Sequence, residues 1–126
     1  MSSPIFKASD AEPQTVQAPW GSLMWVASRD IGNVNDMTLG YVVIKQGVAN
    51  PRHAHPNCEE VLYLLKGRLE HTLGDEKVVM GPGDTIAVPP GVFHNGINIG
   101  DEDAEMIVAY SEGAREFVLE SEAAGS

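Results

Sequence analysis

Cysteine and long apolar runs are the scarcest features of this 126-residue chain. The single cysteine, Cys58, has no partner for an internal disulfide, which agrees with a reducing compartment. No apolar segment approaches the roughly 20 residues that a membrane-spanning helix requires. The N-terminal residues do not combine a basic segment with an apolar run, so no signal peptide is indicated. We therefore expect a cytoplasmic protein.

Basic residues are also few. Eight Lys and Arg face 18 Asp and Glu, which gives a net charge of −10. A field of this sign repels the phosphates of nucleic acids and the surface of anionic membranes. The chain also has no phosphate-binding loop of the GxxxxGK type, no GxSxG motif and no CxxC pair. We expect neither nucleic acid nor a membrane as a partner.

The chain does contain many short segments rich in β-branched residues, separated by turn-forming Gly, Pro, Asn and Asp. The expected strands are 20–28, 37–46, 59–67, 68–73, 77–80, 85–88, 92–98 and 105–110, with 115–120 as a last strand or one helical turn. About eight short strands without a long amphipathic helix predict an all-β antiparallel sandwich or barrel. We assign 1–19 to an N-terminal arm, 20–120 to the barrel domain and 121–126 to a disordered tail.

Three histidines and an acidic pair have the chemistry of a metal site. His53 and His55 are two residues apart, so on a strand both point to one face and can converge on one ion. His94, from a distant segment, can complete the site, and nitrogen and oxygen ligands suit Mn, Fe, Co, Ni, Cu or Zn. Either Glu59 or Glu60 could supply the carboxylate. Both faces of their strand are apolar, so alternation does not choose between them.

The spacing of these residues resembles the two sequence motifs of the cupin superfamily. The first motif reads Gly47, five residues, His53-Ala-His55, four residues, Glu60, six residues, Gly67. The second reads Gly83, five residues, Pro89-Pro-Gly91, two residues, His94, three residues, Asn98. The resemblance covers about residues 38–111. It implies a small jelly-roll barrel, or double-stranded β-helix, around one divalent transition-metal ion, and it selects Glu60 to join His53, His55 and His94 as ligands.

Other side chains have two possible roles each. His71 occupies an inward position between Leu69 and Leu73, where it is either an acid–base group lining the cavity or a core histidine bonded to a backbone carbonyl. Glu60 is a second candidate base if it releases the metal. Cys58 lies among the ligands and is expected to be a structural or oxidisable thiol. Trp25 either caps the barrel mouth or forms a dimer contact, and we expect the dimer contact.

The resemblance implies three functional hypotheses. The first is a metal-dependent enzyme acting on a small organic molecule, similar to the quercetin-dioxygenase-like single-domain cupins. Its chemistry would be dioxygenase-like, or that of a Lewis-acid isomerase or lyase. The second is a metal-dependent module that binds or stores a small molecule without converting it, and the third is a metal-free structural barrel. A complete ligand set disfavours the third and leaves catalysis open. Small cupins commonly pair, so we expect a homodimer.

Overall fold

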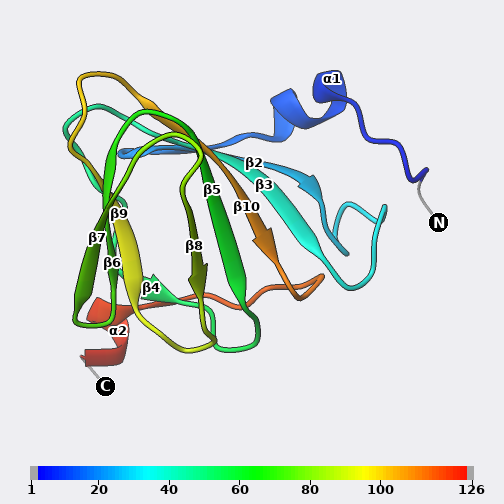
Figure 1. Cartoon of the computed structure of the whole chain (residues 1–126). Coiled ribbons are helices and arrows are strands. Elements are labelled where there is room, and N and C mark those ends of the chain that lie inside the picture. Colours follow the sequence, from blue (N-terminus) through cyan, green and yellow to red (C-terminus); the bar gives the residue numbers. More distant parts are fainter. Residues whose placement is uncertain (1–2, 125–126) are drawn as a thin grey trace.

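The computed structural model describes residues 3–124 and folds them into two antiparallel sheets that face each other (Figure 1). The six-stranded sheet has the order β1 (Val16–Ala18), β2 (Gly21–Ala27), β3 (Thr38–Ile44), β10 (Ala104–Tyr110), β5 (Glu60–Lys66), β8 (Thr85–Val88). The five-stranded sheet has the order β11 (Val118–Leu119), β4 (His53–Ala54), β9 (His94–Asn98), β6 (Leu69–Leu73), β7 (Glu76–Met80). The predicted all-β jelly-roll class is confirmed.

Strand β5 is apolar on both faces, but packing of the second sheet buries only one of them. Glu60, Leu62 and Leu64 are buried, whereas the alternate residues Val61 and Tyr63 remain exposed on the outer face of the sheet. Successive side chains of a strand point to opposite faces, so one face of β5 lines the barrel interior. Glu60 therefore points inward, and Glu59, which directly precedes the strand, is exposed.

The core lies between the two sheets. Its buried hydrophobic side chains come from both sheets and from the loop before β5: Val42, Ile44, Cys58, Leu62, Leu64, Leu69, Met80, Ala104, Met106, Val108 and Tyr110. Leu64 and Leu69 are completely buried. Most of these residues lie on β3, β5 and β10 of the six-stranded sheet, and several of them line the same space as the histidines.

A motif glycine allows the sheets to be joined tightly. Gly67, between β5 and β6, has a φ of +97°, which disfavours any residue with a side chain. A Cβ atom at this position would lie 2.9 Å from the Ala104 Cα. The glycine is thus required both by the turn and by the close approach of β10.

Both termini carry structure beyond the barrel. The segment assigned to an arm contains α1 (Ala8–Ala11), a 3-10 turn η1 (Glu12–Gln14) and β1, which extends the six-stranded sheet at its edge. At the other end, the segment 115–120 contains β11 and the first residue of α2 (Glu120–Ala124). Helix therefore replaces part of the expected disordered tail, and 125–126 lie outside the described residues. Arg52 ties the start of α2 to the barrel by binding Glu120. The domain boundaries stay a prediction. No helix among residues 3–124 has the length and apolar character to span a bilayer.

Candidate metal centre

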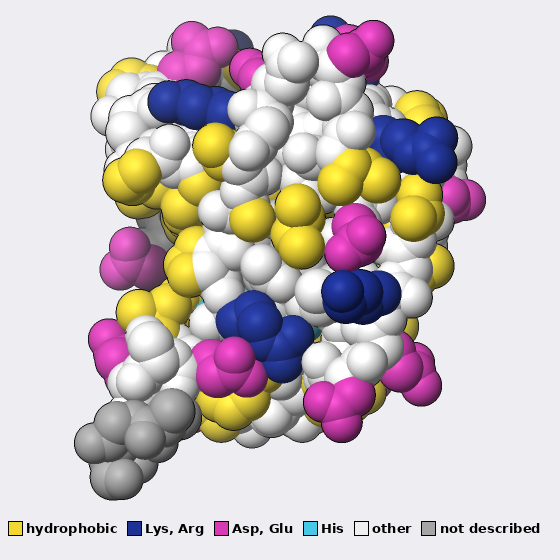
Figure 2. All heavy atoms as spheres, turned by 90° about the vertical axis from the view of Figure 1, so that its left-hand side faces the viewer, with side chains coloured by type: hydrophobic (Ala, Val, Ile, Leu, Met, Phe, Trp, Pro, Cys, Tyr) yellow, Lys and Arg dark blue, Asp and Glu magenta, His cyan; other side chains and the backbone are white. Residues whose placement is uncertain are grey.

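The four expected ligands come from both sheets and meet inside the barrel. His53 opens β4 and lies opposite His94, which opens β9, while His55 follows β4. Glu60 opens β5 and enters from the other sheet. One ligand atom from each of the four residues lies within 4.8 Å of every other. All four side chains are buried, and Figure 2 accordingly shows hardly any histidine on the face that it views.

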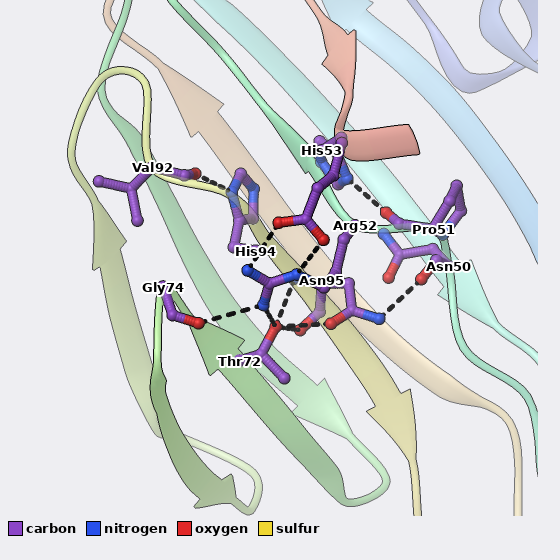
Figure 3. Close-up of polar contacts among 10 residues, drawn as sticks. Asn50, Pro51, Arg52, His53, Thr72, Gly74, Val92, His94 and Asn95 are labelled. Atoms are coloured by element: carbon purple, nitrogen blue, oxygen red, sulfur yellow. Dashed lines mark hydrogen bonds and ion pairs between the residues drawn. The ribbon is translucent and has the colours of Figure 1, made fainter. Parts of the chain in front are cut away.

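Backbone carbonyls orient the three imidazoles. Nδ1 of each ring lies within hydrogen-bonding distance of one carbonyl oxygen: His53 to Pro51 (2.7 Å), His55 to Glu116 (2.9 Å) and His94 to Val92 (2.9 Å). The first and third of these bonds are visible in Figure 3. A carbonyl can only accept, so Nδ1 carries the proton and Nε2 of the neutral ring keeps its lone pair. The rings are thereby prepared to bind a cation through Nε2.

The Glu60 carboxylate lies at the meeting point of these rings. Its Oε1 is 2.9 Å from Nε2 of His94 and 3.2 Å from Nε2 of His55. The His55 nitrogen lies outside hydrogen-bonding geometry, so this buried atom has no hydrogen-bond partner in residues 3–124. Burial favours a raised pKa for Glu60, but the contacts with His55 and His94 outweigh it and hold the pKa well below its usual range. Glu60 is therefore ionised.

Burial also keeps His53 in its neutral form. It lowers the pKa of His53 to about 4, with a further contribution from the charge of His94. His53 is consequently neutral at pH 7 and available as a ligand. Two ligand atoms that bind one metal ion at a right angle, each through a bond of about 2.0–2.2 Å, lie about 3 Å apart. The distances from Glu60 Oε1 to Nε2 of His55 and of His94 match this value. Three imidazole nitrogens and one carboxylate oxygen that converge in this way form a donor set that fits a divalent transition-metal ion.

A cavity of about 230 Å³ opens beside this cluster. Its polar lining includes the four residues above, His71 and Asn50, and its apolar walls include Trp20, Leu23, Val42, Ile44, Leu62, Met106, Val108 and Phe117. Sites for drug-sized ligands span about 300–1,000 Å³, so this cavity suits a smaller molecule.

The structure places His71 at this cavity. Its ring is nearly parallel to that of His94, with 5.9 Å between centroids and 14° between planes. The side chain is 2% exposed, and within residues 3–124 its Nδ1 has no hydrogen-bond partner. Burial, followed by the charge of His94, lowers the pKa of His71 to about 4, so the ring is neutral at pH 7. His71 therefore lines the cavity as a neutral ring, and its acid–base role stays a prediction.

The structure also gives the surroundings of Cys58 and Trp25. Cys58 is buried in the core, and burial raises the pKa of its thiol, so at neutral pH it is not a thiolate nucleophile. Trp25 packs edge-on against Tyr110, with 6.0 Å between ring centroids, and Arg115 lies over its face. Trp25 also lines a wider hollow on the surface, and the dimer contact expected for it stays a prediction.

The chain after β10 contributes contacts that the sequence patterns did not indicate. Phe117 stacks on His53 with 5.0 Å between ring centroids, and Glu116 supplies the carbonyl that orients His55. Tyr110 meets His55 edge-on at 4.8 Å. Residues 111–117 form no strand and show no periodicity, so their position over the cluster follows from long-range contacts: the pairing of β11 with β4 and the hydrogen bonds of Asn57 with Ala114 and Glu116.

A polar network supports the cluster from the side of α2 (Figure 3). Arg52 donates to both carboxylate oxygens of Glu120, to Oγ1 of Thr72 and to the carbonyl of Gly74. The Thr72 hydroxyl in turn bonds Asn95, the residue after His94. These bonds connect β4, β6, β9 and α2, so the strands that carry His53 and His94 are held together independently of any ion.

Comparison with known proteins agrees with this geometry. A family model described as a cupin domain matches residues 40–110. The chain belongs to the cupin family. The resemblance inferred from the two motifs is thus confirmed, while the quercetin-dioxygenase-like subtype stays a prediction.

Individual relatives of this cupin include plant and bacterial proteins. Germin-like protein 3-8 of Oryza sativa subsp. japonica is 32% identical over 84 residues, which are 63% of this chain and 37% of that protein. Oxalate oxidase 2 of Hordeum vulgare is 26% identical over 122 residues, which are 85% of this chain and 53% of that protein. The solved oxalate decarboxylase of Lactobacillus farciminis, in complex with formate, has a TM-score of 0.80 at 19% identity, covering 89% of this chain and 35% of that one. This cupin spans about half or less of the length of these relatives, and the structural likeness shows the fold.

Proposed function

We propose that this cupin is a metal-dependent enzyme acting on a small organic molecule. His53, His55, Glu60 and His94 would hold one divalent transition-metal ion, with Mn, Fe, Co, Ni, Cu and Zn all compatible with the donor set. The observation that carries the proposal is the cavity of about 230 Å³, because this cluster and His71 line one largely apolar space. Relatives named for oxalate oxidation and decarboxylation support small-molecule chemistry.

The bound ion would polarise an oxygen of the substrate as a Lewis acid or, if redox-active, bring dioxygen beside it. The chain's own residues provide the surroundings. The apolar walls leave few polar partners for water in the cavity, and displacement of water by a bound substrate would strengthen electrostatic interactions within it. Phe117 covers His53 on the side of the C-terminal segment. These features favour either dioxygenase-like chemistry or that of a Lewis-acid isomerase or lyase.

We assign proton transfer to His71 in this proposal. The neutral ring lines the cavity, where it can accept a proton from a bound substrate or return one. Glu60 is the second candidate base. Its carboxylate is ionised and contacts two imidazoles, so it could accept a proton only if it released the metal.

Metal content and turnover test the proposal. Protein prepared without a histidine tag is analysed for metals, then stripped and reconstituted with each candidate ion. We expect one equivalent per chain. Iron- or copper-loaded protein is next tested for oxygen consumption with enols, flavonols and diketones, and zinc-loaded protein for isomerase or lyase products. Absence of metal uptake would overturn the proposal. Ligand binding without conversion would instead establish a binding or storage module.

We further propose a cytoplasmic homodimer that pairs through the outer face of the six-stranded sheet. Val61, Tyr63 and Leu65 of β5 are 43%, 44% and 42% exposed there, next to Ile107 of β10. An apolar face of this kind suits association. Light scattering on wild-type protein and on a Tyr63→Glu variant tests the dimer, since a charge on the face is expected to yield monomers. A wild-type monomer would refute it, and cell fractionation tests the location.

A further inference from the structure

One cationic side chain lies beside the metal cluster in an aromatic setting. Arg115 belongs to the irregular segment between β10 and β11. Its guanidinium carbon lies 4.4 Å from the centroid of the Trp25 ring, 5.2 Å from that of Tyr110 and 5.8 Å from that of Phe117. Cation–π attraction to these rings holds the guanidinium and limits its motion. Arg115 is therefore a positioned charge.

The guanidinium also retains its hydrogen-bonding capacity. The Lys and Arg ion pairs in residues 3–124 join Arg29 to Glu112, Arg52 to Glu120, Lys66 to Glu102 and Glu105, and Lys77 to Glu70. None of these pairs involves Arg115, and no side-chain hydrogen bond of the described chain does either. A guanidinium carries five N–H donors in a planar fork. In a chain of net charge −10, a half-buried arginine with all of its donors free is available to an outside anion.

The position of Arg115 connects this charge to the cavity. The cavity at the metal cluster and a wider surface hollow of about 630 Å³ share three lining residues, Leu23, Arg115 and Phe117. Arg115 thus lies where the outer hollow adjoins the inner cavity. Among the described residues it is the one Lys or Arg that lines either space.

We propose that Arg115 binds a carboxylate group of the substrate at the mouth of the cavity, while the remainder of the molecule occupies the apolar space next to the metal cluster. This inference rests on the proposed function for the reaction at that cluster. A planar carboxylate matches the guanidinium fork in a bidentate pair. A single cation balances one negative charge, and the nearby acidic Asp30 and Glu60 disfavour a more highly charged phosphate. The substrate class is therefore a small organic monocarboxylate with an apolar body.

Matched pairs of carboxylates and amides test this assignment. Acetate, butyrate and benzoate are titrated into metal-free protein alongside acetamide, butyramide and benzamide, with calorimetry and tryptophan fluorescence as readouts. Without metal, no ion can hold the carboxylate, so the measurement is independent of metal uptake. We expect at least one carboxylate to bind tenfold or more tightly than its amide, and to change the fluorescence because Trp25 touches the guanidinium.

Variants of Arg115 test whether its side chain causes the preference for carboxylates over amides. Arg115→Gln should remove the tenfold preference while metal uptake remains as in the wild type, and Arg115→Lys should restore part of it because the charge returns without the fork. Arg29→Gln is the matched control, since Arg29 is already paired with Glu112 and should leave the preference intact. Equal binding of carboxylates and amides, or a preference that survives Arg115→Gln, would overturn the inference. Absent metal uptake in the wild type would overturn the proposed function and leave the Arg115 result standing.

Discussion

Replacing Glu60 by Gln, in parallel with Glu59 by Gln, compares two adjacent carboxylates at the start of β5, one buried and one exposed. Glu60 is 4% exposed and contacts two of the three histidines, whereas Glu59 is exposed. The substitution preserves size and removes the charge. We expect Glu60→Gln to weaken metal binding well over tenfold, because it removes the one anionic ligand of the cluster, and Glu59→Gln to leave it unchanged.

The size of the effect can be worked out for thermal unfolding. An ion present at 100 times its Kd stabilises a folded protein by about 2.7 kcal/mol. With about 2.1 cal/mol/K of unfolding entropy per residue, a chain of 126 residues gains about 10 °C in Tm. A tenfold loss of affinity leaves about 1.4 kcal/mol, or about 5 °C, and a hundredfold loss leaves about 0.4 kcal/mol, or less than about 2 °C.

Calorimetry of the chelator-treated and metal-loaded proteins measures these shifts. The metal concentration is held at 100 times the wild-type Kd for all three proteins. We expect a shift of about 10 °C for the wild type and for Glu59→Gln, and below about 5 °C for Glu60→Gln. A full shift in Glu60→Gln would refute the ligand assignment. An equal loss in Glu59→Gln would show that the general negative charge, and not the cluster, attracts the ion.

Three other perturbations have defined outcomes. His71→Ala should retain the metal and lower turnover at least tenfold, as expected for loss of a proton-transfer group, and unchanged turnover would make His71 a packing residue. Leu64→Ala should lower the free energy of unfolding by about 2–5 kcal/mol in urea titrations, because Leu64 is completely buried, and a loss below about 1 kcal/mol would contradict that packing. The metal-free protein should lose stability as the pH falls from 6.5 toward 4. Burial lowers the folded pKa of both His53 and His71 to about 4, so the unfolded chain takes up protons first, at about 3 kcal/mol for each ring. Constant stability in urea titrations across this pH range would contradict the burial of these rings.

Much of the fold follows from local sequence signals. Short β-branched segments bounded by Gly, Pro and Asn predict antiparallel strands, and eight of the observed strands overlap the expected segments closely. The strands β1 and β4 escape such reasoning because each has only two or three residues, and β11 falls within 115–120, where a strand was one of two alternatives. A segment of that length contains no full period of alternation. Its strand conformation depends on a neighbour that is distant in the chain, as β11 depends on β4.

The sequence predicts the ligands of the candidate site better than it predicts the rest of the cavity. His53, His55 and His94 stand at spacings that predict a common site, and the motif spacing selects Glu60. Alternation alone could not exclude Glu59, because the outer face of β5 is as apolar as the inner one. Only packing of the second sheet against one face buries Glu60 and leaves Glu59 in solvent.

The position of the cavity's other side chains was decided by tertiary structure alone. Nothing in the spacing of Arg115 or Phe117 connects them with the histidines, since they lie in an irregular segment about 60 residues beyond His53. Pairing of β11 with β4 brings that segment across the cluster. Three of the metal ligands stand within eight residues, and His94 stands at a fixed position in the second motif, so the spacing within each motif is readable in the sequence. A substrate contacts side chains that are assembled from unrelated segments, and only the folded chain brings these together.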